Sequence, residues 1–546
     1  MCFGQVKYSF NIADATRDDG KLYLWIYFKD KDRSLKKVQI SKKTLARRNK
    51  VHPNKNFEWY DLRPSEAYID QIKSTGATLR GESRWFNAVS IECDEEQLDA
   101  ISSFSFVDKI EPIRQYRKPV EVESQDKRSL NKILDFDNEF YGNSYSQVNQ
   151  INVPAAHKEG YHGQGVSVLV LDTGFNLEHP VFDELNVIAE WDVIYDDSTT
   201  RNETGQDASG NQHNHGTSVL SILAGYAPDT LIGPAFQSDF ILAKTEILDK
   251  EIVAEEDNYV RALEWGETLG ADIMTASLGY TDWYIQDDMD GNTAITTKAV
   301  DIAVAHGIVC VVSAGNENNN NWGTIVAPAD ADSVISVGAL GVDPDNNVYI
   351  ASFSSRGPTA DGRTKPEVCA MGVNTFRALG NGSSYYTGNG TSFAAPLVAG
   401  AAALILNANP DWTPMMVREA LMMTASHSDR PDNTYGWGIV DTWAAINYTG
   451  GNNFLKPELK QNYRNPFKTS TTIKYKLLQS AKVKLKIYNI IGQEIVTLVD
   501  KFEPSGTKTV VWNGRDANDQ KVSSGVYIYT LTVGETQISN KMVLIN

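Results

Sequence analysis

The chain has 546 residues, of which 41% are hydrophobic and 22% are charged, and its formal net charge is −18 at pH 7. This length predicts two to four domains, and the composition is that of a soluble globular protein. The acidic balance excludes nucleic-acid binding as the main task, because there is no basic surplus to neutralise phosphates.

The N-terminal 113 residues contain short elements typical of a small α+β domain. A helix is predicted from Asp94, whose carboxylate can cap the first turn, through Ser102. Strands are predicted at 21–28, 86–93 and 106–113, and another helix at 65–73. Residues 114–140 are polar around a charged centre and are interpreted as a linker.

Between residues 141 and 449, apolar β segments alternate with helical stretches. The β segments are continuously apolar, which indicates a parallel sheet covered on both faces. They read VSVLVLD, DFILAKTEI, DIMTASLG, GIVCVVSAGN and SVISVGAL. Alternating strands and helices predict an α/β domain. A second linker is predicted at 450–460, and the evenly spaced short strands of 461–546 are typical of a β-sandwich.

The lengths of the apolar runs and the spacing of the cysteines argue against a membrane span and a cysteine-based metal site. No run reaches the ~20 residues of a membrane span, and Leu397–Leu406 is expected to be a buried helix. Cys2, Cys93, Cys310 and Cys369 lack CxxC spacing. Pairing of the last two stays open, although their apolar surroundings favour buried thiols. The opening residues MCFGQ could be the tail of a removed signal peptide.

Three segments of the middle domain each place one residue of a nucleophilic triad at the edge of a regular element. Asp172 ends a predicted buried strand, His215 lies at a predicted helix start, and Ser392 opens an apolar helix. A triad needs a nucleophile, a base that takes its proton and a carboxylate that orients the base. Each residue alone has a simpler interpretation: a turn aspartate, a surface histidine or a helix-capping serine.

Two neighbouring signals refine this hypothesis. Asn316 in VVSAGNEN could donate to a developing oxyanion, or it could be an ordinary loop residue. His213 lies beside His215 in HNH, but two histidines without a third ligand make a poor zinc site. An esterase of the α/β-hydrolase type is disfavoured, because its histidine would follow the serine in the chain.

The segments LDTG, HGTSV, SLG, SAGNEN and GTSFAAPLVAG resemble those of the subtilase family of serine proteases, over roughly residues 141–449. The resemblance implies a subtilisin-like parallel sheet with helices on both faces and a serine endopeptidase. It implies that Ser392 attacks the peptide carbonyl, that His215 is its base and that Asp172 orients His215. It further implies that Asn316 and the backbone N–H of Ser392 bind the oxyanion.

The resemblance also implies substrate contacts. One segment would pair with the substrate backbone as an added strand, and a second would form a wall of the primary specificity pocket. The first segment is Ser277, Leu278 and Gly279, and the second is Ser313, Ala314 and Gly315. The small residues of the second segment predict an open pocket that accepts bulky side chains. Catalysis would require no cofactor; the Asn-rich loop that holds a tight calcium ion in many relatives is missing, and weaker structural calcium sites stay open.

The N-terminal region resembles the inhibitory propeptide of subtilases, with a core at about 65–113 and a ferredoxin-like fold. It would act as an intramolecular inhibitor, and residues 114–140 would hold the processing site; a permanent N-terminal domain is the alternative. The C-terminal segments NPF, IYNIIGQE and SSGVY resemble sorting domains of bacterial type IX secretion cargo. A plain spacer sandwich is the alternative there.

These resemblances predict a zymogen that is exported through the periplasm and is secreted or held at the cell surface. Its partners would be protein or peptide substrates, its own propeptide and the secretion machinery, without nucleic acid and without a membrane span. A non-catalytic surface adhesin on the same scaffold is the alternative function.

Overall fold

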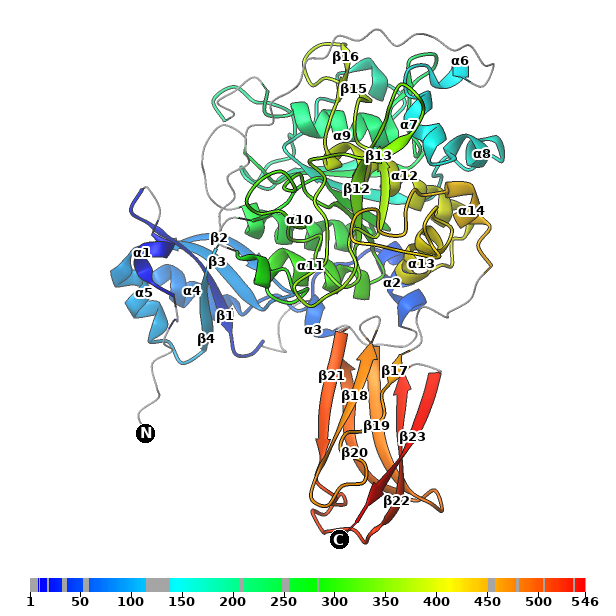
Figure 1. Ribbon diagram of the computed structural model, residues 1–546. Coiled ribbons are helices and arrows are strands. Elements are labelled where there is room, and N and C mark those ends of the chain that lie inside the picture. The colour runs from blue at the N-terminus through cyan, green and yellow to red at the C-terminus, as the bar shows by residue number, and fades with distance from the viewer. Residues whose placement is uncertain are drawn as a thin grey trace. The chain divides into compact units, whose positions relative to one another are not determined.

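The computed structural model describes residues 8, 10–16, 19–31, 37–52, 58–113, 138–206, 211–247, 255–281, 284–449, 457–477, 481–503, 506–533 and 536–545. Its contacts divide the chain into two units, Met1–Tyr448 and Thr449–Asn546 (Figure 1). Most of the two predicted linkers and the MCFGQ start lie outside the described residues.

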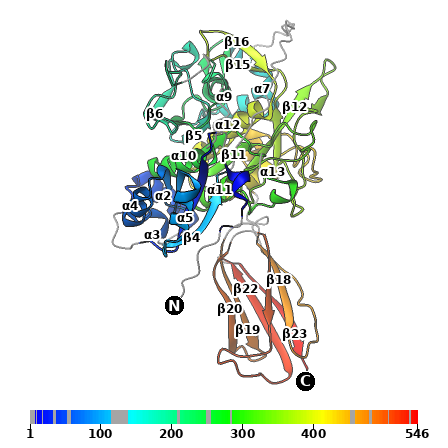
Figure 2. The same ribbon diagram turned by 90° about the vertical axis from the view of Figure 1, so that its left-hand side faces the viewer.

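The N-terminal part of the first unit is an antiparallel sheet in the order β2–β3–β1–β4, with α4 and α5 on one face (Figure 2). Its strands are β1 (Leu22–Phe28), β2 (Thr78–Ser83), β3 (Ala88–Cys93) and β4 (Val107–Pro112). Its helices are α1 (Ile12–Ala15), α2 (Lys42–Val51), α3 (Glu58–Asp61), α4 (Glu66–Ser74) and α5 (Glu95–Ser102). The chain order β1–α4–β2–β3–α5–β4 with this strand order is the predicted ferredoxin-like fold.

The predicted helix after Asp94 is confirmed, because Asp94 Oδ1 accepts from Gln97 N at 2.9 Å and Gln97 Oε1 accepts from Asp94 N at 2.9 Å. The sheet extends beyond the expected core of 65–113, because β1 is an interior strand paired with both β3 and β4. Sequence analysis did not predict β2 or α2.

The rest of the first unit is built on a sheet in the order β13–β12–β11–β10–β5–β9–β6, with β14 beside β12. Its described pairs are parallel except β12 with β13. The strands are β5 (Ser167–Asp172), β6 (Asn186–Asp192), β9 (Asp239–Lys244), β10 (Ile273–Ala276), β11 (Val309–Ser313), β12 (Ile335–Val342), β13 (Val348–Ile350) and β14 (Val368–Met371). Small ribbons are β7 (Tyr226–Ala227) with β8 (Leu231–Ile232) and β15 (Thr375–Ala378) with β16 (Tyr385–Gly388).

Helices cover both faces of this sheet, as the sequence predicted, with α9 and α12 on one face and α10 and α11 on the other (Figures 1 and 2). The longer helices are α9 (Asn214–Ala224), α10 (Glu255–Leu269), α11 (Ile295–Ala305), α12 (Thr391–Ala408) and α13 (Pro414–Met423). Shorter ones are α6 (Asn138–Tyr141), α7 (Tyr145–Gln150), α8 (Val153–Lys158), α14 (Thr442–Ile446), η1 (Pro180–Phe182) and η2 (Gln286–Asp288).

Helix α12 is the core helix of the domain. Its 18 residues are long and apolar enough to cross a membrane by composition, but 89% of the segment is buried inside the protein. This burial agrees with the expected buried helix. The thiols of Cys93, Cys310 and Cys369 are also buried, and each is unpaired.

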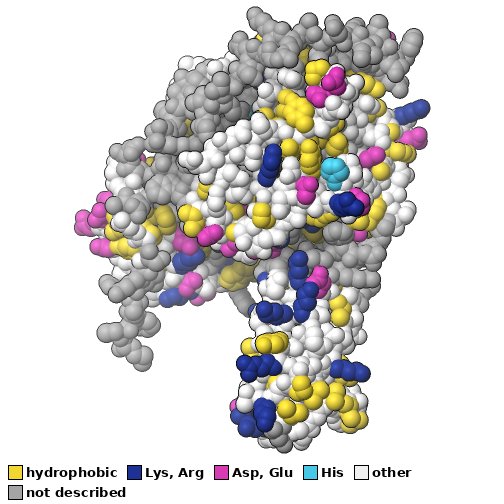
Figure 3. Space-filling view, in the orientation of Figure 1, with side chains coloured by type: hydrophobic (Ala, Val, Ile, Leu, Met, Phe, Trp, Pro, Cys, Tyr) yellow, Lys and Arg dark blue, Asp and Glu magenta, His cyan; other side chains and the backbone are white. Residues whose placement is uncertain are grey.

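The second unit is a β-sandwich. Its sheets have the orders β17–β18–β21 and β20–β19–β22–β23. The strands are β17 (Glu458–Leu459), β18 (Thr471–Leu477), β19 (Ala481–Asn489), β20 (Glu494–Glu503), β21 (Gly506–Trp512), β22 (Gly525–Val533) and β23 (Thr536–Leu544). In β19, Val483, Leu485 and Ile487 face the core while Lys484 and Lys486 face outward. Lys and Arg side chains are prominent on the visible face of this unit (Figure 3).

Candidate active site

The site lies at the carboxyl ends of β5, β10 and β11. The strand order reverses at β5, because β9 and β6 lie between β5 and one edge of the sheet while β10 and β11 lie toward the other edge. Asp172 is the last residue of β5 and is fully buried. Its Oδ1 accepts from Thr173 N at 2.7 Å and from Thr173 Oγ1 at 3.2 Å. These donors hold the carboxylate in one orientation.

His215 lies in the first turn of α9 and contacts Asp172. The distance from His215 Nδ1 to Asp172 Oδ1 is 2.7 Å. Gly216 permits this approach, because a Cβ atom there would overlap the carbonyl oxygen of Gly174. His215 Nε2 is buried and makes no hydrogen bond within the described part of the chain. A bond from Nδ1–H to Asp172 leaves Nε2 as the basic nitrogen.

Ser392 lies in the first turn of α12, next to Phe393, whose ring centroid is 6.0 Å from that of His215. Ser392 Oγ donates to the carbonyl oxygen of Ser277 at 3.3 Å. Among the described residues no hydrogen bond joins this oxygen to His215. Two hydrogen bonds therefore join Ser277 and Ser392, because Ser277 Oγ also donates to the Ser392 carbonyl oxygen at 2.8 Å.

The side-chain amide of Asn316 has a defined orientation. Its Oδ1 accepts from both Thr391 N and Thr391 Oγ1 at 2.9 Å. Because Thr391 N–H can only donate, the oxygen end of the amide must face Thr391, and the Nδ2 end points away from it as a donor. A Cβ atom on Gly390 would lie 3.9 Å from Nδ2, which places the amide beside the residues that precede Ser392. Sequence analysis did not single out Thr391.

The two predicted substrate-binding segments lie on either side of Val326. Ser277, Leu278 and Gly279 follow β10; Ser313 ends β11, and Ala314 and Gly315 follow it. A Cβ atom on Gly279 would overlap Val326 Cγ2, and one on Gly315 would lie 2.8 Å from Val326 Cγ1. The space between the segments is therefore filled by an isopropyl group. The expectation of an open pocket rested on the small residues of the wall alone and did not consider Val326, which lies opposite them.

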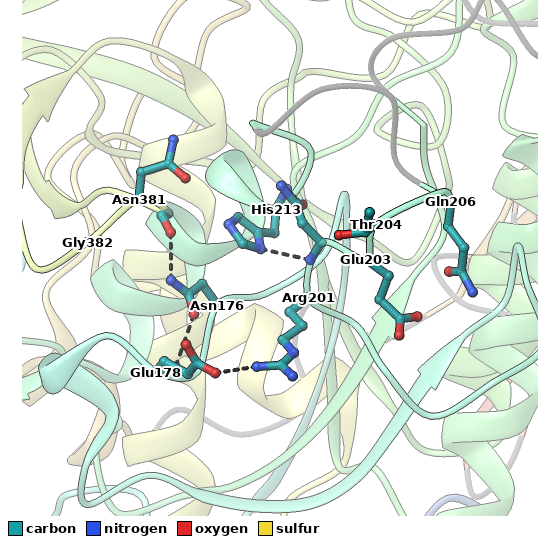
Figure 4. A pocket seen from close by; sticks show the side chains of 11 residues that line it. Asn176, Glu178, Arg201, Glu203, Thr204, Gln206, His213, Asn381 and Gly382 are labelled. Atoms are coloured by element: carbon teal, nitrogen blue, oxygen red, sulfur yellow. Dashed lines mark hydrogen bonds and ion pairs between the residues drawn. The ribbon is translucent and has the colours of Figure 1, made fainter.

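A polar cavity of about 480 Å³ lies beside His213, two residues before His215 (Figure 4). Glu178, Arg201 and His213 line it, together with the turn at 380–382. His213 Nδ1 accepts from Asn202 N at 2.9 Å, so this histidine has a structural task. Within the described residues, no three His, Cys, Asp or Glu side chains are grouped to hold a metal ion.

An ion pair behind the site was also missed by sequence analysis. Lys244, the last residue of β9, is in register with Asp172. Its Nζ lies 2.8 Å from Asp192 Oδ2, and both side chains are fully buried. Burial raises the pKa of Asp192, and the adjacent ammonium group opposes this shift. The pair fixes the ends of β6 and β9 next to Asp172, the last residue of β5.

Comparison with known proteins gives three family matches. The subtilase family matches residues 163–438, the Peptidase S8 propeptide domain of Bacteroidota matches 23–130, and the FlgD Ig-like domain matches 463–537. Subtilisin E from Bacillus subtilis is 30% identical over 381 residues, which cover 69% of this chain and 85% of the relative. A subtilisin from Bacillus pumilus is 35% identical over 300 residues, covering 55% of this chain and 97% of the relative.

A solved structure supports the same fold. Fervidolysin from Fervidobacterium pennivorans, a keratinolytic enzyme related to subtilisin, matches with a TM-score of 0.58 and 20% identity, covering 96% of this chain and 72% of that chain. The parallel sheet, with a hydrogen-bonded histidine and aspartate at its carboxyl edge, defines the class of subtilisin-like serine endopeptidases. The chain belongs to the subtilase family. These matches favour the enzyme over the non-catalytic adhesin.

Proposed function

We propose that the chain is a secreted, self-processing zymogen that hydrolyses peptide bonds through Asp172, His215 and Ser392. The hydrogen bond of 2.7 Å between His215 and Asp172, which leaves Nε2 free to act as a base, is the observation that carries the proposal. Asn316 is proposed as the oxyanion donor because Thr391 holds its amide with Nδ2 available.

The proposed reaction starts when the Ser392 hydroxyl turns from the Ser277 carbonyl to His215 Nε2. Ser392 Oγ attacks the peptide carbonyl carbon while Nε2 takes its proton. Asn316 Nδ2 and the Ser392 N–H stabilise the negative oxygen. The intermediate breaks its C–N bond, and the imidazolium gives its proton to the leaving amine. Water then attacks the acyl-enzyme with His215 again as base, which releases the acid and restores Ser392.

The nucleophile is tested by Ser392→Ala. The variant should lose peptide hydrolysis and should accumulate as the uncut full-length chain. Both readouts come from one purification, by a peptide assay and by mass spectrometry of the intact protein. Self-cleavage that persists in this variant contradicts the proposed zymogen mechanism.

The primary specificity pocket is proposed to be shallow and to favour small side chains before the cut. Val326 occupies the space between Gly279 and Gly315, so a large ring has no room there. Val326→Gly should raise kcat/KM for a substrate with Phe before the cut by about 30- to 100-fold relative to one with Ala, because a buried aromatic ring gains ~2–3 kcal/mol. Val342→Gly, at the exposed end of β12, is the matched control. An unchanged Phe/Ala ratio in Val326→Gly would contradict this pocket.

Export is proposed from the C-terminal unit. The apolar pair Ile490–Ile491 lies in the segment that resembles sorting domains, at the turn between β19 and β20, and both side chains are about 70% exposed. In a host with type IX secretion, Ile490→Asp with Ile491→Asp should keep the protease inside the cell, whereas Lys521→Asp should not. If the double isoleucine variant were exported as well as Lys521→Asp, the proposed sorting role would be contradicted and the unit would be interpreted as a plain spacer.

The proposed chemistry uses no cofactor, and structural calcium is a separate question. A chelator should leave the initial rate of peptide hydrolysis unchanged. A fall in the melting temperature under the same conditions would report a stabilising cation.

A further inference from the structure

Helix α2 buries polar and charged side chains and exposes an apolar one, which is the reverse of an ordinary amphipathic helix. Its buried residues are Thr44, Arg47 and Arg48, while its apolar Leu45 is 50% exposed. A helix normally turns its apolar stripe to the core. The buried face of α2 is therefore selected by a polar partner, and that partner lies on α10 of the catalytic domain.

Arg47 binds the ends of two helices. Its guanidinium group donates to the carbonyl oxygen of Glu267 in the last turn of α10 and to that of Ala271, two residues after the helix. Its Nε donates to the carbonyl oxygen of His306 after α11 at 3.2 Å. The last carbonyls of a helix lack partners in the helix and carry the negative end of its dipole. Arg47 satisfies these groups and supplies the opposite charge.

Glu267 is the centre of the contact and is fully buried. Its Oε1 accepts from Arg47 Nη2 at 2.8 Å and from Arg48 Nε at 2.9 Å, and its Oε2 accepts from Arg84 Nη2 at 2.8 Å. Arg48 also makes a two-pronged pair with Asp61 at 2.9 and 3.0 Å. Although burial raises the pKa of Glu267, the charges of His306 and of the three neighbouring arginines bring it down to about 2.

The ends of α2 add further contacts to the catalytic domain. Thr44 Oγ1 donates to the Glu267 carbonyl oxygen at 2.7 Å, and Lys43 Nζ lies 2.7 Å from Asp272 Oδ2. Lys50 Nζ donates to the carbonyl oxygen of Pro410, in the connection between α12 and α13. Figure 1 shows α2 set apart from the N-terminal sheet. The two regions share Glu267 through Arg84, which follows β2, whereas the contacts of Lys43, Thr44 and Lys50 belong to α2 alone.

We propose that α2, with Asp61, is a second anchor that keeps the N-terminal domain bound to the catalytic domain after the connection between them is cut. The surface it fits is one carboxylate, Glu267, surrounded by helix-end carbonyl oxygens, and this surface selects a helix with adjacent arginines. The inference rests on the proposed zymogen function. It makes the cut propeptide a tightly held inhibitor whose release depends on separating the arginines from Glu267.

The test measures how fast the N-terminal fragment leaves the rest of the chain. A recognition site for an added protease replaces residues 121–128 in the full-length Ser392→Ala chain, which is then nicked, and fragment release is followed by size-exclusion chromatography. Arg47→Ala with Arg48→Ala should release the fragment about 100-fold faster or more, because the buried carboxylate of Glu267 then keeps only Arg84 of its three guanidinium partners and the helix-end carbonyls lose Arg47. Glu267→Gln, on the catalytic side, should act in the same direction.

Arg63→Ala is the matched control, because Arg63 pairs with Glu82 at 2.8 Å inside the N-terminal domain and is half exposed. It should leave the release rate within about twofold of the parent rate, because this exposed pair does not reach the catalytic domain. Should the arginine or glutamate variants fail to fold, Lys43→Ala removes a partly exposed contact and should speed release by about two- to fivefold. Release at the parent rate in the foldable anchor variants overturns the proposal.

The nick is made by an added protease in an inactive chain, so this result is independent of self-processing. Failure of the proposed zymogen function would instead appear as continued self-cleavage in Ser392→Ala before the nick.

Discussion

Acid pH should loosen the N-terminal domain from the catalytic domain, because His306 is buried between them. The His306 ring meets the rings of Tyr60 and Trp85 edge-on at 5.0 and 5.3 Å. Burial is the largest cause that lowers the pKa of His306 well below 6.5. Glu267, 3.8 Å away, opposes this shift, and the charges of Arg48, Arg84 and Arg47 add to it.

The sign and size of the effect follow from proton linkage. Above pH 6.5 His306 is neutral whether the domain is docked or released, so docking is independent of this group. Below pH 6.5 the released state binds a proton that the docked state excludes, and docking weakens as the pH falls. One proton costs ~1.4 kcal/mol per pH unit, so a fall to about pH 5 weakens docking by ~2 kcal/mol, or ~30-fold.

Hydrogen exchange of the full-length Ser392→Ala chain measures this directly. After correction for the intrinsic pH dependence of exchange, the opening free energy of amides in α2 and at the end of α10 should fall by ~2 kcal/mol between about pH 7.5 and pH 5. His306→Phe in the same background keeps a ring between Tyr60 and Trp85 but cannot be protonated. An equal fall in both chains, or no fall in the parent chain, would refute the assignment to His306.

Asn316→Leu should lower kcat by about 10²- to 10³-fold with little change in KM; this magnitude is the one known for the corresponding donor in subtilisin, and steady-state kinetics on a peptide would check it. His213→Ala should retain kcat within about tenfold, because Nδ1 of His213 holds Asn202 rather than Ser392, and a larger loss in the same assay would contradict this structural task. Trp512→Ala should destabilise the C-terminal sandwich by ~3–5 kcal/mol, since this buried ring packs on Phe467 and Tyr527. Thermal unfolding should show an earlier transition for that unit with unchanged peptide hydrolysis, and loss of hydrolysis would show that the two units do not act independently.

The catalytic fold was predictable because its signals are local and strong. Continuous apolar runs such as VSVLVLD specify buried parallel strands. In the N-terminal domain, Asp94 likewise specifies a helix start within four residues. The triad hypothesis also rests on short segments, and its residues stay predictions for function although Asp172 and His215 are hydrogen-bonded.

What could not be predicted depends on partners far away in the sequence. The segment SKKTLARRNK has no apolar period, because its helix is specified by Glu267, 220 residues beyond Arg47. Val326 was missed for the same reason: the effect proposed for it depends on its position beside Gly279 and Gly315, which the sequence around Val326 does not indicate. The pair of Lys244 with Asp192 likewise joins β9 and β6, and the sequence of neither strand indicates that the two are neighbours in the sheet.

The two hydrogen bonds from Thr391 to Asn316 affect how the kinetics of variants at residue 391 should be interpreted. Thr391 precedes the proposed nucleophile Ser392 by one residue and holds the amide of Asn316, 75 residues away in the chain. Loss of its hydroxyl would let the Asn316 amide rotate, so Thr391→Val would show the kinetic signature of an impaired oxyanion donor while Asn316 itself is intact. A genetic screen would therefore score residue 391 as catalytic, when what it contributes is the rigidity of its neighbour.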